Sequence, residues 1–379
     1  MRNPPLSLYI HIPWCVQKCP YCDFNSHTLK QALPEQEYVA HLLDDLANDA
    51  KLVTDRVVET IFIGGGTPSL LSPEALDSLL SGVKQRINLA NDAEITLEAN
   101  PGTVEVGRFN GFQAAGVNRI SIGVQSFQTE HLQALGRIHD SQQASNAAAF
   151  ARSAGLRSFN LDLMHGLPQQ SVENALADLT QAIAQAPPHL SWYQLTLEPN
   201  TPFYSKPPTL PDDDILWQIQ AQGHQLLIAA GYEHYEISGY AKPAHQCQHN
   251  LNYWRFGDYL GIGCGAHSKI TDAANKRIER RVKVKHPRGY MQIGREYTDQ
   301  LTFVNEDERP FEFFMNRLRL CEPCPLEEFN AFTGLEIDKN ISTALKRSEG
   351  LGLISLNSDT MTVTEHGRRY LNSLLEMFV

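Results

Sequence analysis

Short apolar segments alternate with amphipathic helical patterns along the first 240 residues, and this alternation constrains the fold more than any other feature. Strands joined by crossover helices form a parallel sheet with helices packed on its faces. The fold class is therefore α/β, with either a (β/α) barrel or a doubly wound sheet. The expected strands are Leu6–Ile12, Thr60–Ile63, Glu94–Glu98, Arg119–Val124, Phe159–Met164, Leu190–Leu197 and, less regular than the others, Glu233–Ile237.

The segments between these strands have the start and stop signals of helices. Tyr38, Leu42 and Leu46 recur at helical spacing after the first strand. Ser72-Pro73 resembles a helix N-cap followed by proline at the first helical position. Glycines close three later helical patterns, as expected for a left-handed residue after a helix end; these are Gly116, Gly155 and Gly231.

Polar and glycine-rich clusters follow almost every expected strand. Because parallel strands share the edge at which they end, these clusters are expected along one rim of the sheet, where (β/α) barrels carry their chemistry. The clusters are a loop with three cysteines, Gly64-Gly65-Gly66-Thr67, Glu98-Ala99-Asn100-Pro101, Gln125-Ser126, Asp162 with His165-Gly166, and Glu198-Pro199-Asn200.

The pattern changes after Tyr240. Residues 241–305 contain a stretch rich in glycine, histidine and aromatic residues, then a basic run from Lys276 to Arg288, and we interpret this part as a connecting region. The basic run suits an anionic group, an acidic partner, anionic lipid or simply a solvated strand face. Residues 306–379 show helical patterns followed by a short hairpin at Leu353–Val363, which resembles a winged-helix domain.

The composition narrows the functional class. The 379 residues carry a formal net charge of −11, which argues against nonspecific nucleic-acid binding. The apolar stretch Leu6–Ile12 is too short for a signal peptide core or a membrane span, so a cytoplasmic protein is expected. Seven cysteines is an odd number, and three of them lie within eight residues, so a metal or cluster site is favoured over a disulfide framework.

The three clustered cysteines follow the first expected strand in the pattern Cys15-x3-Cys19-x2-Cys22. Three thiolates on one short loop suit several soft metal atoms at once. A structural zinc site is the alternative, but it normally uses two separated pairs of ligands.

This spacing resembles the motif of the radical S-adenosylmethionine (SAM) superfamily. The resemblance implies a partial parallel (β/α) barrel and a [4Fe-4S] cluster held by the three cysteines, with one iron open to SAM. Gly64-Gly65-Gly66-Thr67-Pro68 is similar to the glycine-rich loop of that superfamily.

Further motifs resemble the oxygen-independent coproporphyrinogen III oxidase family over almost the whole chain. They are Tyr9-Ile-His11-Ile-Pro13, Gly123-Val-Gln125-Ser-Phe127 and Asn160-Leu-Asp162-Leu-Met-His165-Gly-Leu-Pro168. The residues that this resemblance assigns to SAM binding are Tyr9, Gly65, Gly66, Thr67, Glu98, Gln125, Arg137 and Asp162.

Two departures from the oxidase pattern favour a sister branch of that family, the HemW-type heme chaperones. Phe24 stands where the oxidases have a fourth cysteine, and the N-terminal extension of the oxidases is missing before Cys15. The chaperone branch also has a His-Asn-x-x-Tyr-Trp motif, which is found here as His249-Asn250-Leu251-Asn252-Tyr253-Trp254. An imidazole can ligate heme iron and aromatic rings can pack on a porphyrin, and His245, Cys247 and His267 are rival ligands.

The resemblance thus implies a heme chaperone with a [4Fe-4S] cluster, exchangeable SAM and heme; the alternative is a porphyrinogen-oxidising radical SAM enzyme. The expected partners are heme, heme-acceptor proteins including membrane-associated ones, an electron donor and a second copy of the chain. A DNA-binding regulator is disfavoured because the last helix offers only Arg368 and Arg369 as cations.

Overall fold

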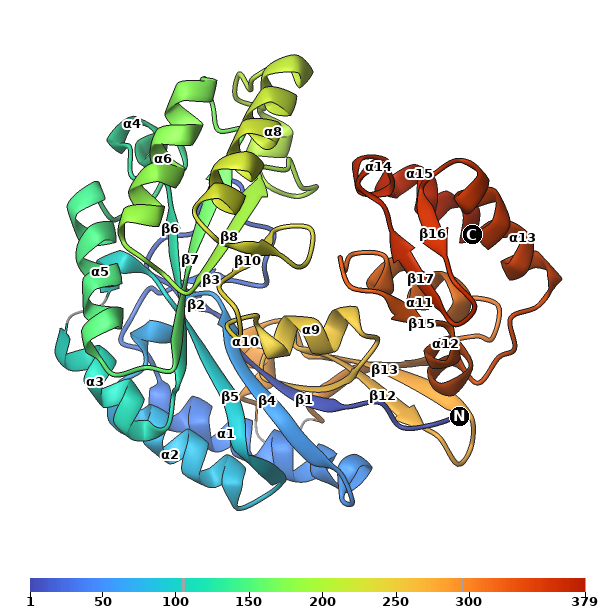
Figure 1. Ribbon diagram of the computed structural model, residues 1–379. Coiled ribbons are helices and arrows are strands. Elements are labelled where there is room, and N and C mark those ends of the chain that lie inside the picture. The colour runs from blue at the N-terminus through green and yellow to red at the C-terminus, as the bar shows by residue number, and fades with distance from the viewer. Residues whose placement is uncertain (104–105, 293, 295, 379) are drawn as a thin grey trace.

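The computed structural model describes residues 1–103, 106–292, 294 and 296–378. Within them, twelve strands form one sheet in the order β14-β13-β12-β11-β1-β4-β5-β6-β7-β8-β10-β9. The sheet curves like a barrel (Figure 1). The barrel is open because the strands at the two ends of this order, β14 and β9, do not pair with each other. Its parallel centre consists of β1 (Leu6–Ile12), β4 (Val57–Gly65), β5 (Asn88–Ala99), β6 (Arg119–Gln125), β7 (Ser158–His165) and β8 (His189–Gln194).

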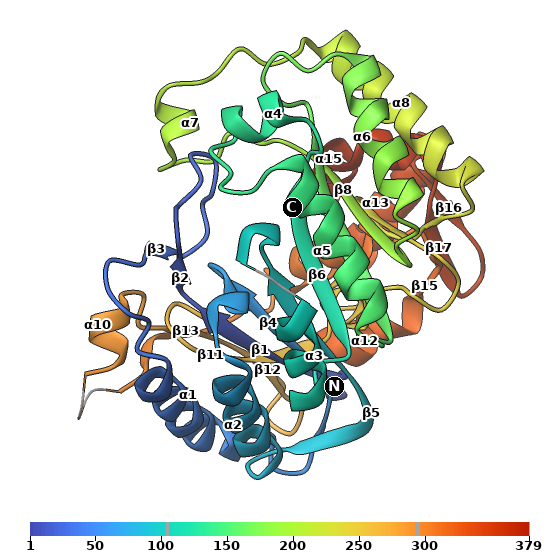
Figure 2. The ribbon, with the colours of Figure 1, turned by 90° about the vertical axis from the view of Figure 1, so that its left-hand side faces the viewer.

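Helices cover the convex face of the sheet. Figures 1 and 2 show them side by side on this outer face; they are α1 (Glu35–Asp49), α2 (Pro73–Lys84), α3 (Val106–Ala115), α5 (Ser141–Ser153), α6 (Val172–Ala184) and α8 (Asp213–Ala229). Residues of the central strands that point outward pack against these helices; Leu8, Ile10 and Leu42, for example, are fully buried in one core. Residues of the opposite parity face the concave interior, where the chemistry collects.

The expected (β/α) architecture is confirmed, and the order of the sheet decides for an open barrel. All six central strands lie where the apolar segments predicted them. The side chain of Ser72 caps α2 by accepting a hydrogen bond from the backbone N–H of Ala75 at 3.1 Å. The seventh expected strand is shorter than predicted: β9 (Glu233–His234) pairs antiparallel with β10 (Gly239–Ala241), which in turn pairs with β8.

Residues 241–305, interpreted above as a connecting region, extend the same sheet. The strand β11 (Asp258–Ile262) pairs parallel with β1, and β12 (His267–Asp272), β13 (Arg277–Lys283) and β14 (Thr298–Phe303) follow antiparallel. The helix α9 (Gln248–Trp254) precedes them. This segment therefore supplies one wall of the barrel interior, while the boundaries at 240 and 305 stay a prediction.

The basic run is mostly neutralised within the fold, because α1 supplies buried carboxylates opposite β13. Lys283 is buried and contacts Asp45 at 2.5 Å and Asp49 at 2.6 Å. Arg281 contacts Asp49 at 3.1 Å. The run is therefore divided: Lys283 is neutralised in the core, whereas the side chains of Lys276, Arg277, Lys285 and Arg288 are exposed.

The last part of the chain folds as a separate small domain, red in Figure 1. Its helices α11 (Arg309–Arg317), α12 (Leu326–Thr333) and α13 (Lys339–Gly350) pack with a three-stranded sheet of β15 (Cys324–Pro325), β16 (Ile354–Leu356) and β17 (Thr360–Val363). The short helices α14 (Glu365–Arg369) and α15 (Leu371–Leu375) complete it. Three helices with a small hairpin confirm the expected winged-helix-like domain.

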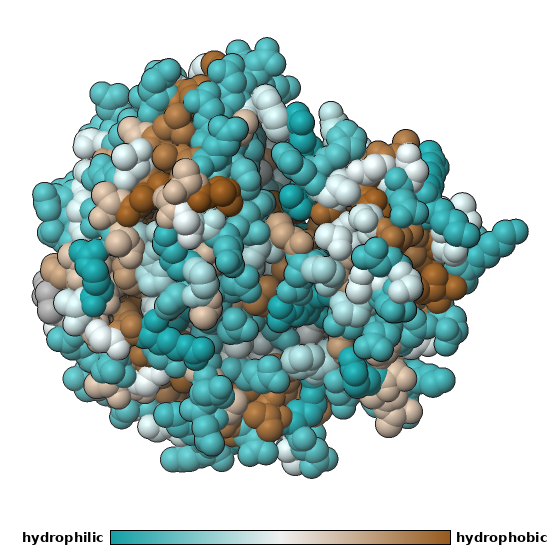
Figure 3. All heavy atoms as spheres, viewed as in Figure 1, coloured by the Kyte–Doolittle hydropathy of each residue, from teal (hydrophilic) through white to brown (hydrophobic). Residues whose placement is uncertain are grey.

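This domain packs against the β11–β14 side of the sheet. The rings of Phe256 and Phe313 meet edge to face at 5.5 Å, and Arg280 of β13 pairs with Glu312 of α11 at 2.6 Å. Figure 3 shows a mixed polar and apolar surface that is indented between the barrel and this domain. None of the helices in the described residues is both long and apolar enough to cross a membrane.

Candidate functional site: two adjoining cavities

A cavity of about 460 Å³ lies at the C-terminal ends of the central strands. It collects every residue expected for the cluster and for SAM except Tyr9, namely Cys15, Cys19, Cys22, Gly65, Gly66, Thr67, Glu98, Gln125, Arg137 and Asp162. Most of these residues come from the loop after β1 and from the C-terminal parts of β4 to β7, and Arg137 follows the short helix α4 (Thr129–Ala134). The parallel register brings them together, as the predicted rim requires.

The three cysteines are free thiols on the cavity wall. Cys15 belongs to the short strand β2 (Trp14–Cys15), which pairs with β3 (His27–Thr28), while Cys19 and Cys22 follow in the loop between them. Burial raises the pKa of Cys15 and of Cys22, so each thiol needs a nearby positive charge to ionise. The guanidinium of Arg137 lies 3.6 Å from the sulfur of Cys19. Among the described residues, no three His, Cys, Asp or Glu side chains are arranged so that they could hold a single metal ion.

The glycine-rich loop packs directly on the cysteine loop. The backbone N–H groups of Gly66 and Thr67 donate to the carbonyls of Ile12 and Trp14, each at 2.7 Å. A Cβ atom on Gly66 would collide with the Trp14 carbonyl, and Gly65 has a φ of +117°. The glycines therefore let the cysteine loop pack closely against the end of β4, and their contact with SAM stays a prediction.

Two buried carboxylates face this cavity. Burial raises the pKa of Glu98 to about 8, with the neighbouring Asp162 adding to the effect. Burial likewise raises the pKa of Asp162, against hydrogen bonds from Ser121 and Asn160 at 3.0 and 2.7 Å. The described residues supply no salt bridge to either carboxylate. A cationic ligand would relieve both charges.

Polar donors complete the cavity. Arg137 donates to the carbonyl of Gly123 at 2.6 Å, but its buried Nε has no partner among the described residues. Gln125 ends β6 with a left-handed φ of +67° and accepts a hydrogen bond from Tyr193 at 2.9 Å. A ligand that is cationic at one end and carries a carboxylate for Arg137 matches this set, and SAM, a sulfonium amino acid, has both features.

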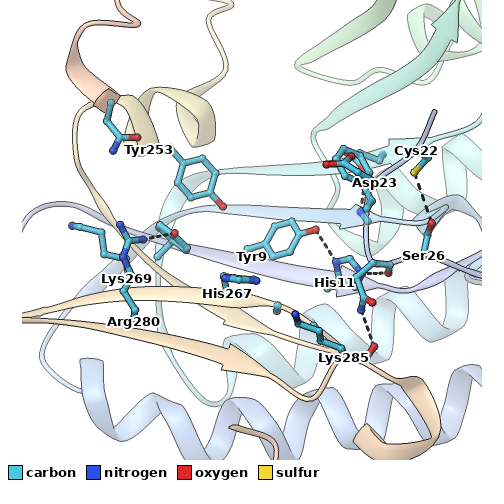
Figure 4. A pocket seen from close by; sticks show the side chains of 18 of the residues that line it. Tyr9, His11, Cys22, Asp23, Ser26, Tyr253, His267, Lys269, Arg280 and Lys285 are labelled. Carbon is cyan, nitrogen blue, oxygen red and sulfur yellow. Dashed lines mark hydrogen bonds between the residues drawn. The ribbon is translucent and has the colours of Figure 1, made fainter. Parts of the chain in front are cut away.

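A second cavity of about 920 Å³ adjoins the first. The two share Lys18, Cys22, Asp23, Phe24, Ser26, Gly65 and Glu98 as lining residues. Tyr9 lies here, on the interior face of β1, and donates to Nδ1 of His11 at 2.9 Å (Figure 4). The far wall comes from α9, β11 to β13 and Met315 of α11, so the segment interpreted as a connecting region builds this cavity.

Aromatic rings and cations dominate the larger cavity. The aromatic residues are Tyr9, Phe24, Tyr253, Trp254, Phe256 and Tyr259. Among the cations, Lys269 is buried and paired with Asp258 at 2.9 Å, and Arg280 is paired with Glu312. Lys285 is exposed and has no carboxylate partner among the described residues. The cavity thus offers flat apolar surfaces and at least one uncommitted positive charge.

The His-Asn-x-x-Tyr-Trp motif is divided between core and cavity. Tyr253 and Trp254 line the larger cavity, whereas His249 and Asn250 line neither cavity. His249 is 1% exposed. Its Nδ1 lies 2.7 Å from Thr60 Oγ1 and its Nε2 lies 3.0 Å from the hydroxyl of Tyr253. Both ring nitrogens therefore already have hydrogen-bond partners.

Comparisons with known proteins agree with this geometry. The profile of the Radical SAM superfamily matches residues 9–179, and that of the HemN C-terminal domain matches residues 304–370. The chain is 63% identical to the heme chaperone HemW of Escherichia coli (strain K12), over 100% of this chain and 99% of the relative. The chain belongs to the HemW family. Its identity to the heme chaperone HemW of Haemophilus influenzae is 56%, over 100% of this chain and 99% of the relative.

A solved structure shows the same fold. Coproporphyrinogen III oxidase (HemN) from Escherichia coli, described as a radical SAM enzyme, superimposes with a TM-score of 0.84 at 24% identity, covering 99% of this chain and 90% of that one. Membership of the radical SAM superfamily gives the HemW family a [4Fe-4S] cluster and SAM as cofactors, and the cysteine loop, the buried carboxylates and Arg137 fit both.

The sequence did not indicate several residues of the larger cavity. Tyr259 and Lys269 lie in strands of a segment interpreted as a connection, and their place at the cavity depends on β11 pairing with β1. Lys285 belongs to the basic run that the sequence did indicate. A signal was present, because Asp258–Ile262 is a short apolar run bounded by glycines, as expected of a buried strand.

Proposed function

We propose that this protein is a heme chaperone that binds heme in the larger cavity and passes it to acceptor proteins. The observation that carries the proposal is the cavity itself. Its volume of about 920 Å³, its aromatic walls and its free cation suit a flat, apolar macrocycle with carboxylate side chains. Support comes from full-length relatives named heme chaperones at 63% and 56% identity.

The smaller cavity serves the cluster and SAM in this proposal. Cys15, Cys19 and Cys22 would hold the [4Fe-4S] cluster, and exchangeable SAM would bind beside it in the same cavity. Glu98 and Asp162 face the positive groups of SAM, and Arg137 pairs with its carboxylate. Gln125, Gly65, Gly66 and Thr67 shape the wall. When bound, the cluster would supply an electron to SAM, and this chain's residues would hold both groups beside the larger cavity.

Phe24 distinguishes the chaperone from a porphyrinogen oxidase. Its side chain is 56% exposed and lines both cavities, so an apolar ring stands between the cluster and the larger cavity. A porphyrin in the larger cavity can stack on this ring. The aromatic face thus favours holding heme there over reacting a porphyrinogen at the cluster.

The test is an anaerobic heme titration of the reconstituted full chain, run beside a turnover assay with coproporphyrinogen III, SAM and a reductant. We expect saturable heme binding and no carbon dioxide from the porphyrinogen. Release of carbon dioxide without saturable heme binding would contradict the chaperone proposal and favour the oxidase alternative.

The partners follow from the same proposal. Heme is the cargo, heme-acceptor proteins including membrane-associated ones receive it, and an electron donor reduces the cluster. We propose a cytoplasmic location and no nucleic-acid partner, since the net charge is −11. A second copy of the chain is a further candidate partner. Co-purification with heme-depleted acceptors, with heme-loaded and heme-free protein compared, tests the acceptor assignment.

A further inference from the structure

If heme binds in the larger cavity as proposed, one side chain of the cavity must reach the iron. Three histidines line the larger cavity, and the motif histidine lies behind its wall. These are His11, His27, His267 and, in the core, His249.

Two of the four imidazoles have hydrogen-bond partners at both ring nitrogens, and the Nε2 atom of a third is buried. His11 accepts from Tyr9 at one nitrogen and lies 2.9 Å from the carbonyl of Asn25 at the other. The Nε2 atom of His27 has no hydrogen-bond partner among the described residues, but it is buried, and the ring packs edge-on against His286 at 5.3 Å. His249 is bonded at both nitrogens, as described above. None of these rings can turn a lone pair into the cavity without breaking the packing around it.

His267 differs from all three in that its side chain is exposed and no ring nitrogen is hydrogen-bonded within the described residues. It begins β12 at the barrel interior. Figure 4 shows the ring of His267 in the middle of the cavity, below Tyr9 and Tyr253. We propose that His267, and not the motif histidine His249, is the axial ligand of the heme iron.

The surroundings of His267 suit the rest of the heme. The exposed Lys285 lies close enough to His267 to affect its charge, and it can pair with a propionate. Tyr9 and Tyr253 offer rings on the opposite side of the cavity. Partial burial, Lys285 and Arg280 lower the pKa of His267, so the ring is neutral near pH 7 with its lone pair available. No proton has to leave when it binds iron.

His249 is then a positioning residue. The hydroxyl of Thr60 donates to Ser7 at 2.8 Å, so Thr60 accepts the Nδ1–H of His249. That tautomer leaves Nε2 as acceptor for the hydroxyl of Tyr253. The series of hydrogen bonds that links Ser7, Thr60, His249 and Tyr253 therefore fixes the orientation of the Tyr253 ring at the cavity wall. The motif acts on heme through that ring.

The test compares the heme complexes of three single variants of the full, anaerobically reconstituted chain with that of the unchanged protein. The variants are His267→Ala, His249→Gln and, as a control at an exposed histidine of α14 outside the cavity, His366→Ala. Ferric heme is the titrant, and absorbance and electron paramagnetic resonance report the iron ligand. Circular dichroism reports whether each variant is folded.

We expect His267→Ala to weaken heme binding by about tenfold or more and to lose the imidazole signature. Added imidazole should restore the signature, because the free ligand can occupy the vacated space. His249→Gln and His366→Ala should keep it. An unchanged signature in His267→Ala, or its selective loss in folded His249→Gln, would overturn the ligand assignment alone. Absence of saturable binding by the unchanged protein would overturn the proposed function as well.

Discussion

The buried carboxyl group of Glu98 should make the free energy of unfolding depend on pH. The carboxyl group accepts a hydrogen bond from Gly65 N–H at 3.0 Å and lies near Asp162, with no cation paired to it in the described residues. Burial raises its pKa from 4.5 to about 8 in the folded chain. The folded state therefore holds this proton more tightly than the unfolded state. The stabilising contribution is complete below about pH 4.5 and is lost as the pH rises through about 8.

The substitution Glu98→Gln mimics the protonated carboxyl and keeps the acceptor for Gly65. A change from 4.5 to about 8 corresponds to an upper limit of about 5 kcal/mol in the free energy of unfolding, at about 1.4 kcal/mol per pH unit. Because Glu98 borders two cavities where solvent screens charge, we expect about 2 kcal/mol. The variant should therefore be more stable than the unchanged chain at about pH 8.5 and nearly equal to it at about pH 5.

The assay is thermal unfolding of the metal-free, reduced protein across this pH range, with the exposed Glu37→Gln as control. The difference in midpoint between Glu98→Gln and the unchanged protein should grow as the pH rises, and Glu37→Gln should show no such trend. A difference independent of pH, or larger at about pH 5 than at about pH 8.5, would refute the reasoning about this buried carboxyl.

Three further outcomes are expected. Phe24→Ala should weaken heme binding by about tenfold, because it removes a stacking surface. The control Phe303→Ala changes a comparably exposed ring and should leave the affinity within about twofold. Equal effects of the two substitutions in a heme titration would contradict the placement of heme. Asp258→Asn should lower the free energy of unfolding by about 3 to 5 kcal/mol, because it leaves the buried Lys269 without its carboxylate, and a loss below about 1 kcal/mol in denaturant unfolding would argue against that pairing. Iron and sulfide assays should find no cluster in the folded triple alanine variant of Cys15, Cys19 and Cys22, and full iron content would contradict their assignment.

Much of the smaller cavity could be predicted from the sequence because its residues are tied to strand ends. Glu98, Gln125 and Asp162 each lie at or near the end of a parallel strand, and the shared edge of the sheet brings such positions together whatever the details of packing. The cysteine spacing is local and needs no tertiary information. The sequence therefore predicted which residues meet.

The larger cavity could not be predicted in the same way, because it depends on contacts between distant segments. The pairing of β11 with β1 places Tyr259 beside Ser7, which lies 252 positions earlier in the sequence. It thereby brings residues that are far apart in the sequence around the larger cavity. The burial of His249 likewise results from α9 packing on β4, where Thr60 supplies its partner. Helical spacing alone gives no sign of which face α9 buries.

The ion pairs of the basic run show the same limit. Lys283 lies 238 positions from Asp45 and 234 from Asp49. The run itself contains one acidic residue, Glu279, whereas the fold supplies two buried carboxylates from α1. Lys285, two positions later, stays exposed at the cavity. One lysine of the run is thus buried in ion pairs and the other is exposed at the cavity. The position of each residue relative to the sheet decides which of the two it is.

The central claim is that heme is bound in order to be handed on, and a transfer measurement tests it most directly. The reconstituted protein is loaded with ferric heme, freed of excess heme by gel filtration and mixed with apomyoglobin as a scavenger, with absorbance following the change of heme ligand. The account predicts saturable loading and complete transfer of heme to the scavenger, faster in Phe24→Ala than in the unchanged protein. Failure to load, or heme that stays on the chain despite excess scavenger, would contradict it.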